Sequence, residues 1–170
     1  RVVQKYAPDI RYAEILLNYA EALNEVEGSY EIPSWNGETM YTITRSATAL
    51  KEGIQPIRIR AGLPDYEVYD DVKKFRFKVK RERQIELFAE GHRFFDIRRW
   101  RIAEDVCNEY IQGYDVTKGK DGGFYTIVNV GDRMVFEKKH YLFPLATAEI
   151  LMNPALEQNP GWPKLSTATN

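Results

Sequence analysis

The feature that most constrains this chain is an apolar pattern of helical spacing over residues 12–26. Apolar side chains recur there at intervals of four and three, at Tyr12, Leu16, Tyr19, Leu23 and Val26. A second apolar row lies about 100° further around the helix axis and consists of Ala13, Leu17 and Ala20. A helix that is apolar over most of its circumference must be covered on several sides. The pattern therefore predicts a helix wedged between other helices, beginning at Pro8-Asp9 and ending at Gly28.

Two more amphipathic helices are predicted after this segment. The same rhythm returns over residues 43–61, where Pro56 removes an internal hydrogen bond and predicts a kink or a break. A third helix is predicted from about Asp70 to Ala89 or Glu90. Its inner arc consists of Phe75, Val79, Ile85 and Ala89.

The segments around these helices contain turn signals. Residues 29–42 are expected to form a loop because they contain Pro33 and Asn36-Gly37. A short helix is expected after Gly91 and extends to Val106. The sequence thus predicts a mostly α protein that belongs to a helical array, with helices over residues 9–106.

The chain changes character after Tyr110. The runs Tyr125–Val130 and Met134–Phe136 predict a small β-hairpin within an irregular stretch over residues 110–145. One helical turn is expected near Thr147–Leu151. Three prolines between positions 154 and 163 exclude regular structure further on. Residues 146–170 are therefore expected to form an extended Pro-rich strap that packs its Trp162 on the body.

Size and charge are those of one domain over residues 1–170. Its 44% hydrophobic and 29% charged residues are ordinary for a globular protein, and the net charge of -1 gives no whole-chain attraction to nucleic acid. Residues 73–101 contain 11 Lys/Arg against 4 Asp/Glu, a net +7 beside a remainder of -8. A basic segment beside an acidic remainder indicates internal charge pairing.

The cysteine count, the lengths of the apolar runs and the first residues limit the kinds of site and protein that this sequence can form. Cys107 is the only cysteine, which excludes an intrachain disulfide and a multi-cysteine metal site. No apolar run approaches the ~20 residues that span a bilayer. Because the sequence opens with Arg1-Val2-Val3 and no initiator Met, we expect it to be part of a longer protein.

Two carboxylates, Glu82 and Glu86, lie one turn apart in the middle of the inner arc of the third predicted helix. Carboxyl groups ~5–5.5 Å apart can act as acid and nucleophile in retaining glycoside hydrolysis. The alternative is that arginines neutralise them in the interior, because an unpaired buried carboxylate costs several kcal/mol. Such partners are available at Arg83, Arg93, Arg98 and Arg99, and across from the preceding helix at Arg58 and Arg60. Nearby guanidinium groups would lower the pKa of both carboxyls, which favours ion pairing over general acid catalysis.

Other chemistry-bearing patterns favour structural roles. Residues 75–83 alternate basic and aromatic side chains as nucleic-acid surfaces do, but Phe75 and Val79 lie on the core stripe. No nucleic-acid partner is therefore expected. His92 and His140 are far apart and lack ligands at metal spacing, so both are expected to be structural and no metal or cofactor is expected.

The expected loop between the first two helices carries Trp35, Asn36 and Tyr41. An aromatic plate beside an amide suits sugar recognition, because the ring covers the apolar C–H face while the amide pairs with hydroxyls. These three residues are the candidate ligand contacts. The alternative is that Trp35 caps a nearby core.

Several stretches, in a fixed order along the chain, carry a resemblance to a known family. They are RYAEILLNYAEALNEV (11–26), IRIRAGLP (57–64), RERQIELFAEGHRFFDIRRW (81–100), FP (143–144) and NPALEQNPGW (153–162). The third is the most specific, and the closing Gln-Asn-Pro-Gly-aromatic is an independent match. The chain resembles the C-terminal portion of the SusD/RagB family, whose members run to several hundred residues.

The resemblance implies a mostly α-helical fold of tetratricopeptide-like helix pairs and an outer-membrane lipoprotein at the cell surface. It implies a nutrient-binding protein without enzymatic activity, which binds glycan, or sometimes peptide, and delivers it to a SusC-like TonB-dependent transporter. Membrane contact would run through an N-terminal lipid anchor outside this chain. The resemblance also implies a structural charge network of Glu82, Arg83, Glu86, Arg93, Asp96, Arg98 and Arg99.

The residues leave two other functions open. One is a glycoside hydrolase that uses Glu82 and Glu86. The other is a helical-repeat adaptor that binds only protein, as helix-pair arrays commonly do.

Overall fold

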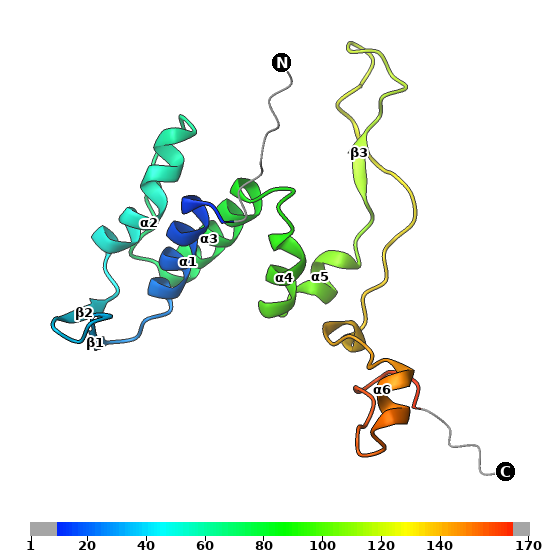
Figure 1. Cartoon of the computed structure of the whole chain (residues 1–170). Coiled ribbons are helices and arrows are strands. Elements are labelled where there is room, and N and C mark those ends of the chain that lie inside the picture. Colours follow the sequence, from blue (N-terminus) through cyan, green and yellow to red (C-terminus); the bar gives the residue numbers. More distant parts are fainter. Residues whose placement is uncertain (1–9, 165–170) are drawn as a thin grey trace, which may run out of the picture. The chain divides into compact units, whose positions relative to one another are not determined.

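The computed structural model describes residues 10–164, whose elements fall into two units that divide between Arg93 and Phe94 (Figure 1). The predicted helix start at Pro8-Asp9 lies outside the described residues. The first helix, α1 (Tyr12–Asn24), follows an extended Arg11 that makes no side-chain capping bond. The helix ends at Asn24, before the predicted stop at Gly28. Gly28 adopts a positive φ of 84° just ahead of the first strand.

Helix α1 packs against both other helices of the N-terminal unit, α2 (Ala47–Arg60) and α3 (Val72–Glu86). Leu17, Ala20 and Leu23 are buried along this face, whereas Tyr12 is 74% exposed. The apolar pattern around α1 predicts a helix covered on several sides, and α2 and α3 cover it. The outer tyrosine row faces solvent, because Tyr carries a hydroxyl that solvent satisfies.

The segment predicted as a loop is a β-hairpin. Strand β1 (Ser29–Pro33) pairs antiparallel with β2 (Met40–Thr44), with Ile32 opposite Tyr41 and Tyr30 opposite Ile43. The loop prediction was wrong, because Pro33 and Asn36-Gly37 do not exclude strands on either side of a turn. Pro33 instead ends an edge strand, where a missing N–H is tolerated, and Gly37 supplies the positive φ of 75° that the turn needs.

Helix α2 (Ala47–Arg60) begins four residues later than expected, because Ile43 belongs to β2. The Ser46 side chain caps it by accepting from the Ala49 N–H. The expected break at Pro56 does not occur, since the helix continues to Arg60 with the proline on its exposed side. The missing N–H of an exposed helix position leaves a carbonyl that water can satisfy.

Gly53 permits the close crossing of α1 and α2. A Cβ at this position would lie 2.8 Å from the Ala20 Cβ and 2.8 Å from the Leu16 carbonyl oxygen. The two helices therefore approach each other where both have small side chains. This crossing explains why a residue that weakens helices stands inside α2.

Helix α3 (Val72–Glu86) is capped by Asp71, whose side chain accepts from the Lys74 N–H. Phe75 and Val79 are buried as predicted. The other half of the predicted inner arc is wrong, because Ile85 is 60% exposed and Ala89 lies beyond the helix at a positive φ of 64°. The buried face continues instead through charged side chains.

The core of the N-terminal unit joins these three helices. Its buried members are Leu17, Ala20, Leu23, Leu50, Ile54, Ile57, Tyr69, Phe75, Val79 and Leu87. Buried Asn24 ties the unit's loops to it, because its amide donates to the Val72 carbonyl and accepts from Arg45. The hairpin adds Ile43 to the margin of this core.

The C-terminal unit holds a smaller core. Helix α4 (His92–Arg99) begins at the boundary and is followed by α5 (Ala103–Cys107). Buried Ile97, Ala103 and Phe136 form the core, and Cys107 packs against it. A 3₁₀ turn, η1 (Lys138–Tyr141), follows Phe136 in the chain.

The small β-hairpin expected in the C-terminal unit is present, but one of its two strands differs from the prediction. Strand β3 (Gln112–Tyr114) pairs antiparallel with β4 (Ile127–Asn129). The predicted second strand at Met134–Phe136 was wrong, because those residues are not in a strand. Phe136 is drawn into the small core, and Asn108 holds its backbone through a bond to both its N–H and its carbonyl.

The tail folds back on the chain that precedes it. After α6 (Thr147–Met152), the Gln158 side chain bonds both backbone groups of Leu145. The Trp162 indole N–H donates to the carbonyls of Lys139 and Leu142 at 3.1 and 3.0 Å. The tail therefore packs its tryptophan on the unit through specific backbone hydrogen bonds. Within residues 10–164, none of the helices has both the length and the apolarity needed to cross a bilayer.

Candidate functional site

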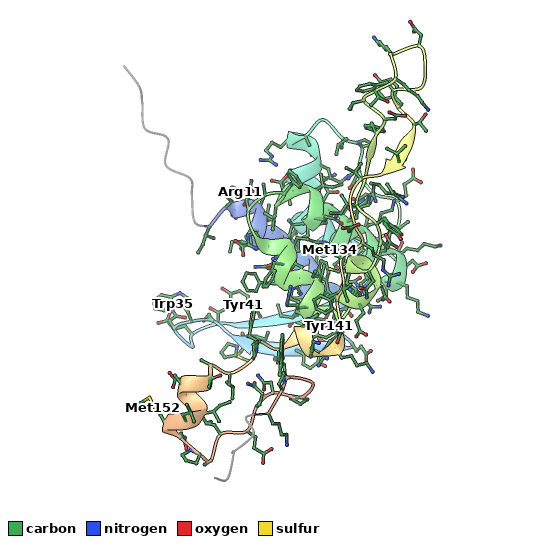
Figure 2. The ribbon with its side chains drawn as sticks, turned by 90° about the vertical axis from the view of Figure 1, so that its right-hand side faces the viewer. Arg11, Trp35, Tyr41, Met134, Tyr141 and Met152 are labelled. Carbon is green, nitrogen blue, oxygen red and sulfur yellow. The ribbon has the colours of Figure 1, made fainter. Side chains whose placement is uncertain are left out.

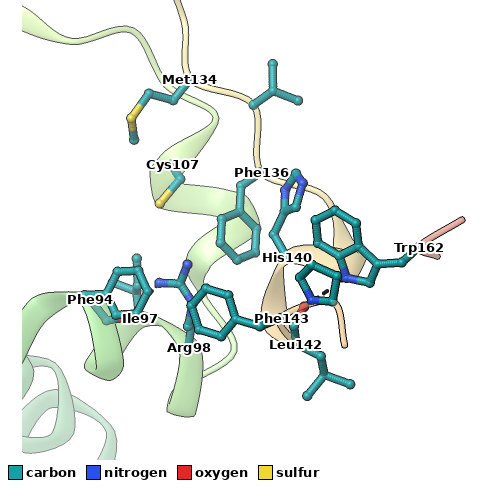
Figure 3. A pocket seen from close by; sticks show the side chains of 12 residues that line it. Phe94, Ile97, Arg98, Cys107, Met134, Phe136, His140, Leu142, Phe143 and Trp162 are labelled. Atoms are coloured by element: carbon teal, nitrogen blue, oxygen red, sulfur yellow. Dashed lines mark hydrogen bonds between the residues drawn. The ribbon is translucent and has the colours of Figure 1, made fainter. Parts of the chain in front are cut away.

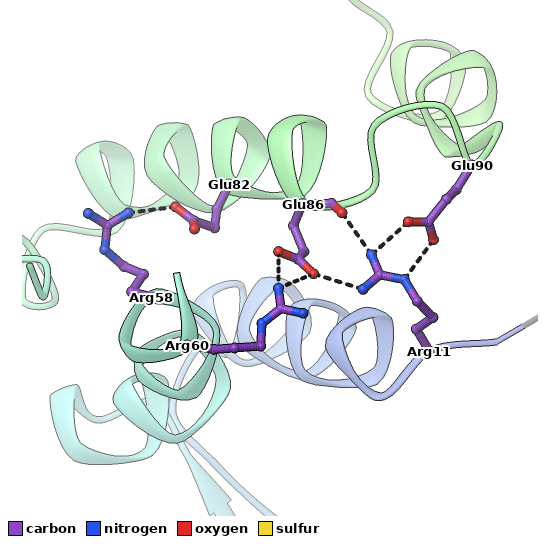
Figure 4. A network of polar contacts seen from close by, with 6 residues as sticks. All are labelled: Arg11, Arg58, Arg60, Glu82, Glu86 and Glu90. Atoms are coloured by element: carbon purple, nitrogen blue, oxygen red, sulfur yellow. Dashed lines mark hydrogen bonds and ion pairs between the residues drawn. The ribbon is translucent and has the colours of Figure 1, made fainter. Parts of the chain in front are cut away.

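The paired carboxylates of α3 lie in an ion-pair network (Figure 4). Glu82 is 5% exposed and accepts from Arg58 Nη1 at 2.7 Å and from the Tyr66 hydroxyl at 2.5 Å. The Arg58 guanidinium also lies 4.0 Å from the centre of the Tyr66 ring. Burial and the bond to Glu82 raise the pKa of Tyr66, so the phenol remains a donor.

Glu86 is held by two guanidinium groups from two other elements. Arg60 Nη2 lies 2.5 Å from its Oε2, and Arg11 Nη1 lies 2.9 Å from its Oε1. Arg11 also donates to the Glu86 backbone carbonyl and makes a two-pronged contact with Glu90. The bonds to Glu90 and Glu86 raise the pKa of Arg11, which keeps its charge fixed.

The network joins the ends of three segments that are distant in sequence. Arg11 precedes α1, Arg58 and Arg60 end α2, and the acids lie on α3. Charge-assisted bonds of this kind are about twice as strong as neutral ones. Each carboxylate therefore has guanidinium partners in place of an open face, which suits a scaffold and opposes proton transfer to a substrate.

The other charged residues expected in the network make contacts of their own. Arg83 is buried on α3 and donates to Asn18 at 2.5 Å. In α4, Asp96 is buried and pairs with Arg99 at 2.8 Å. Arg93 is half-buried at the end of the N-terminal unit. Arg98 lies against aromatic rings of the C-terminal unit.

Sequence reasoning missed three members of the network, Arg11, Tyr66 and Glu90. Arg11 opens the first family-like stretch, but its partners lie 75 and 79 residues away. Tyr66 lies in the link between α2 and α3, where no periodic pattern marks a buried position. Only an unexplained need for donors at Glu82 could have indicated it.

The β1–β2 hairpin carries the candidate ligand contacts. Trp35 is 98% exposed in the turn, and Tyr41 is 55% exposed on β2 (Figure 2). Directly opposed residues share a face of a two-stranded sheet, so Tyr41 lies beside Ile32 on one apolar face. Trp35 covers no core within the described residues, which removes the alternative role expected for it.

Asn36 serves the turn itself. Its carbonyl oxygen accepts from the Ser34 hydroxyl and the Glu38 N–H, and its amide nitrogen donates to the Glu38 carboxylate. These bonds hold the turn that presents Trp35. The hairpin thus offers exposed rings on a fixed backbone, with the amide occupied.

Two hollows adjoin each other within the C-terminal unit. One, of about 470 Å³, is apolar and is lined by Phe94, Phe136, Phe143 and Trp162 among others (Figure 3). The other, of about 490 Å³, is lined by basic side chains. Arg98 and Leu142 border both. Among residues 10–164, no group of three His, Cys, Asp or Glu side chains could hold a metal ion.

The fold and these sites together define a class of mostly helical protein with neutralised interior acids and exposed aromatic surfaces. The SusD family model matches residues 3–162, and the chain belongs to this family. A relative from Formosa agariphila, "SusD-like protein P2", is 31% identical over 160 residues, which cover 92% of this chain and 26% of that protein.

Solved structures agree with the family assignment. A SusD-like protein from Bacteroides fragilis NCTC 9343 is 30% identical with a TM-score of 0.68, and the match covers 91% of this chain and 25% of that one. The protein BT4246 is 27% identical with a TM-score of 0.68, over 93% of this chain and 24% of that one. The expected SusD-type, mostly helical fold is confirmed. The chain spans about a quarter of the length of these relatives.

Proposed function

We propose that this chain is part of a nutrient-binding protein of the bacterial cell surface, which holds oligosaccharide for a SusC-like TonB-dependent transporter. The match to the SusD family over residues 3–162 carries this proposal. The protein would be an outer-membrane lipoprotein, anchored by a lipid on a part of the protein outside this chain. It would act by binding, without catalysis.

Two features of the structure support binding over catalysis. The two carboxylates best placed for glycosidase chemistry are each bonded to guanidinium groups. Exposed aromatic rings on the hairpin offer the flat apolar surface that the C–H face of a sugar prefers. Trp35 and Tyr41 remain the proposed contacts, and Asn36, whose amide is occupied by the turn, positions Trp35.

Glycan binding is tested with a glycan array followed by calorimetry on the best ligand. Trp35→Ala should weaken binding about two- to tenfold, the value expected for loss of one stacking contact of about 0.5–1.5 kcal/mol. Trp35→Phe should recover part of it. Tyr110→Ala, which removes an exposed ring of the other unit, is the matched control. Unchanged affinity in Trp35→Ala would remove the hairpin from the site.

The transporter partnership is tested in the source bacterium. A tag on the full-length protein should recover a SusC-like transporter from outer membranes in mild detergent. Protease added to intact cells should degrade the tagged protein if it lies at the cell surface. Recovery of soluble adaptors without a transporter would favour the protein-binding alternative.

The hydrolase alternative is tested with the double variant Glu82→Gln, Glu86→Gln. We expect no sugar release from either the wild type or the variant, and a lower urea midpoint for the variant. Breaking the buried pair of Glu82 with Arg58 costs about 3–5 kcal/mol. The loss at Glu86 is smaller, because the Arg60 side chain is exposed and Arg11 keeps its bonds to Glu90. Turnover by the wild type that disappears in a folded variant would establish the hydrolase instead.

A further inference from the structure

The charged side chains that line the basic hollow of the C-terminal unit are all positive. Its lining contains Arg98, Arg101, Lys138 and Lys139, together with Tyr141, Leu142, Pro160 and Gly161, and no acidic side chain. Lys139 is balanced by Glu137 at 2.9 Å, and this bond lowers the pKa of the Glu137 carboxyl. Arg98, Arg101 and Lys138 have no carboxylate partner among the described residues. Three positive charges therefore remain around one hollow.

Arg98 is the most constrained of these cations. Its guanidinium lies 3.6 Å from the centre of the Phe94 ring and 5.2 Å from that of Phe136 (Figure 3). Its Nη1 donates to the Phe94 carbonyl at 2.8 Å, but its buried Nε has no hydrogen-bond partner among residues 10–164. Arg58 in the other unit shows the usual arrangement, with a carboxylate bonded in place. A buried charged donor without a partner is unfavourable. The Arg98 side chain also borders both hollows, from which an anionic oxygen can approach its guanidinium group.

The apolar hollow also borders Arg98. It presents the Phe143 ring, which is 70% exposed and stacks on Phe94 with centroids 6.2 Å apart. The Trp162 ring is fixed there by its two hydrogen bonds to backbone carbonyls. Rigid aromatic surfaces beside a few polar groups are typical of sites for small ligands, and both hollows lie in the size range of ~300–1,000 Å³.

We propose that these two hollows form a binding site for an acidic saccharide, which places a carboxylate or sulfate group against Arg98. The acidic group would lie between Arg98, Arg101 and Lys138, and a sugar ring would rest on Phe143. The aromatic face and the cations occur together, which fits an acidic sugar better than a bare anion. This inference rests on the proposed glycan-binding function and gives it a substrate class.

The test compares acidic probes with neutral forms of the same sugars. Tetragalacturonate is compared with its methyl ester, and a sulfated carrageenan tetrasaccharide with its desulfated form. The acidic forms should bind to chain 1–170 at least about tenfold more tightly, as expected for charge-assisted hydrogen bonds. Their affinity should fall in about 0.5 M NaCl, where exposed charges are screened. The stronger of the two acidic probes identifies the acidic group.

Variants locate the site. The double variant Arg101→Gln, Lys138→Gln changes two exposed side chains outside the core and should weaken acidic binding about tenfold. Arg98→Gln should weaken it at least as much, with circular dichroism as the check of folding. Lys120→Gln, an exposed lysine of the same unit, is the matched control and should have no effect.

The outcomes separate this proposal from the function on which it rests. Equal binding of acidic and neutral forms would overturn the acidic site and leave glycan binding intact. Acidic binding that survives all three site substitutions would overturn the assignment to these hollows. If no probe binds and the glycan array is also blank, both proposals fall.

Discussion

At the scale of single residues, the interior of the N-terminal unit is organised by guanidinium groups. Glu82 and Glu86 have side chains only 6% and 11% exposed. Carboxylates at such positions require bonded donors, and Arg58, Arg60 and Arg11 supply them. Three of the family-like stretches of the sequence are thus tied together by one set of contacts.

Gly53 provides a test of how tightly α1 and α2 approach each other. Gly53→Ala gains about 1 kcal/mol of helix propensity but places a methyl group 2.8 Å from the Leu16 carbonyl oxygen. Forced overpacking costs about 1–3 kcal/mol, so we expect a net loss of stability in urea unfolding. Gly119→Ala, where nothing lies within 4 Å, should be neutral. A stabilised Gly53→Ala protein would show that the helices separate freely.

Acid should weaken the unit through Glu90. The hydrogen bond from Arg11 holds the pKa of this carboxyl below its ordinary value of 4.5. A group whose pKa is lowered by folding stabilises the fold above its unfolded pKa, and the stabilisation disappears as pH falls through the folded pKa. The unfolding free energy should therefore decline below about pH 4.5.

Arg11→Gln tests the origin of this acid sensitivity. The variant should be less stable at neutral pH and should lose less further stability on acidification, measured by urea unfolding at about pH 6 and about pH 3. Arg133→Gln, which changes an exposed arginine of the other unit, should keep the wild-type profile. An identical pH dependence in Arg11→Gln and wild type would contradict the assignment.

At the scale of elements, the structure shows where local sequence rules compete. Asn36-Gly37 and Pro33 marked a turn correctly, but the residues on either side form strands. The flanking Tyr, Ile, Met and Thr residues favour strands, and their pairing outweighs the proline. Likewise, the packing of Ile54 and Ile57 on either side of Pro56 keeps α2 continuous.

Replacement of Pro56 measures the cost that this packing overcomes. Pro56→Ala restores a backbone N–H within α2 and removes the ring from an exposed position. A helix-interior proline is about 3 kcal/mol less favourable than alanine. We expect thermal unfolding to show a gain of about 1–3 kcal/mol. Thr48→Ala in the same helix should change stability by only a few tenths of a kcal/mol, and a destabilised Pro56→Ala protein would show that the proline is needed.

At the scale of the whole chain, two units have separate cores. The larger core contains residues from 17 to 87, and the smaller one contains Ile97, Ala103 and Phe136. The tail belongs to the second unit, because Gln158, Asn159 and Trp162 bond the backbone of residues 139–145. The closing family-like stretch therefore has a structural reason, which is to fasten the tail.

Hydrogen exchange tests this division. Trp162→Ala removes two hydrogen bonds and a ring contact with His140. Amides of residues 138–145 should exchange faster, whereas those of α1, α2 and α3 should be unchanged because their core lies in the other unit. Trp35→Ala is the control and should alter neither region, since its ring is exposed. Faster exchange throughout the chain would show that the two units unfold together.

Much of the architecture was predictable from local pattern. The helices, the burial of Phe75 and Val79 and the helical turn after residue 146 follow from spacing and capping rules. The resemblance predicted the family, which the match over residues 3–162 confirms. Strand partners were not predictable, since the pairing of β3 with β4 joins residues separated by a long turn-rich tip. Such pairing depends on contacts that no short window contains.

The sequence by itself determined which segments are helical and that the interior acids need arginine partners, because periodicity and charge balance are local properties. Only the tertiary structure decided which arginines serve them and which cation, Arg98, remains beside an aromatic hollow. The physical reason is that a buried charge is stabilised by whichever donor the fold brings within about 3 Å. That distance depends on how the helices pack and turn toward each other, which the order of residues along the chain does not state.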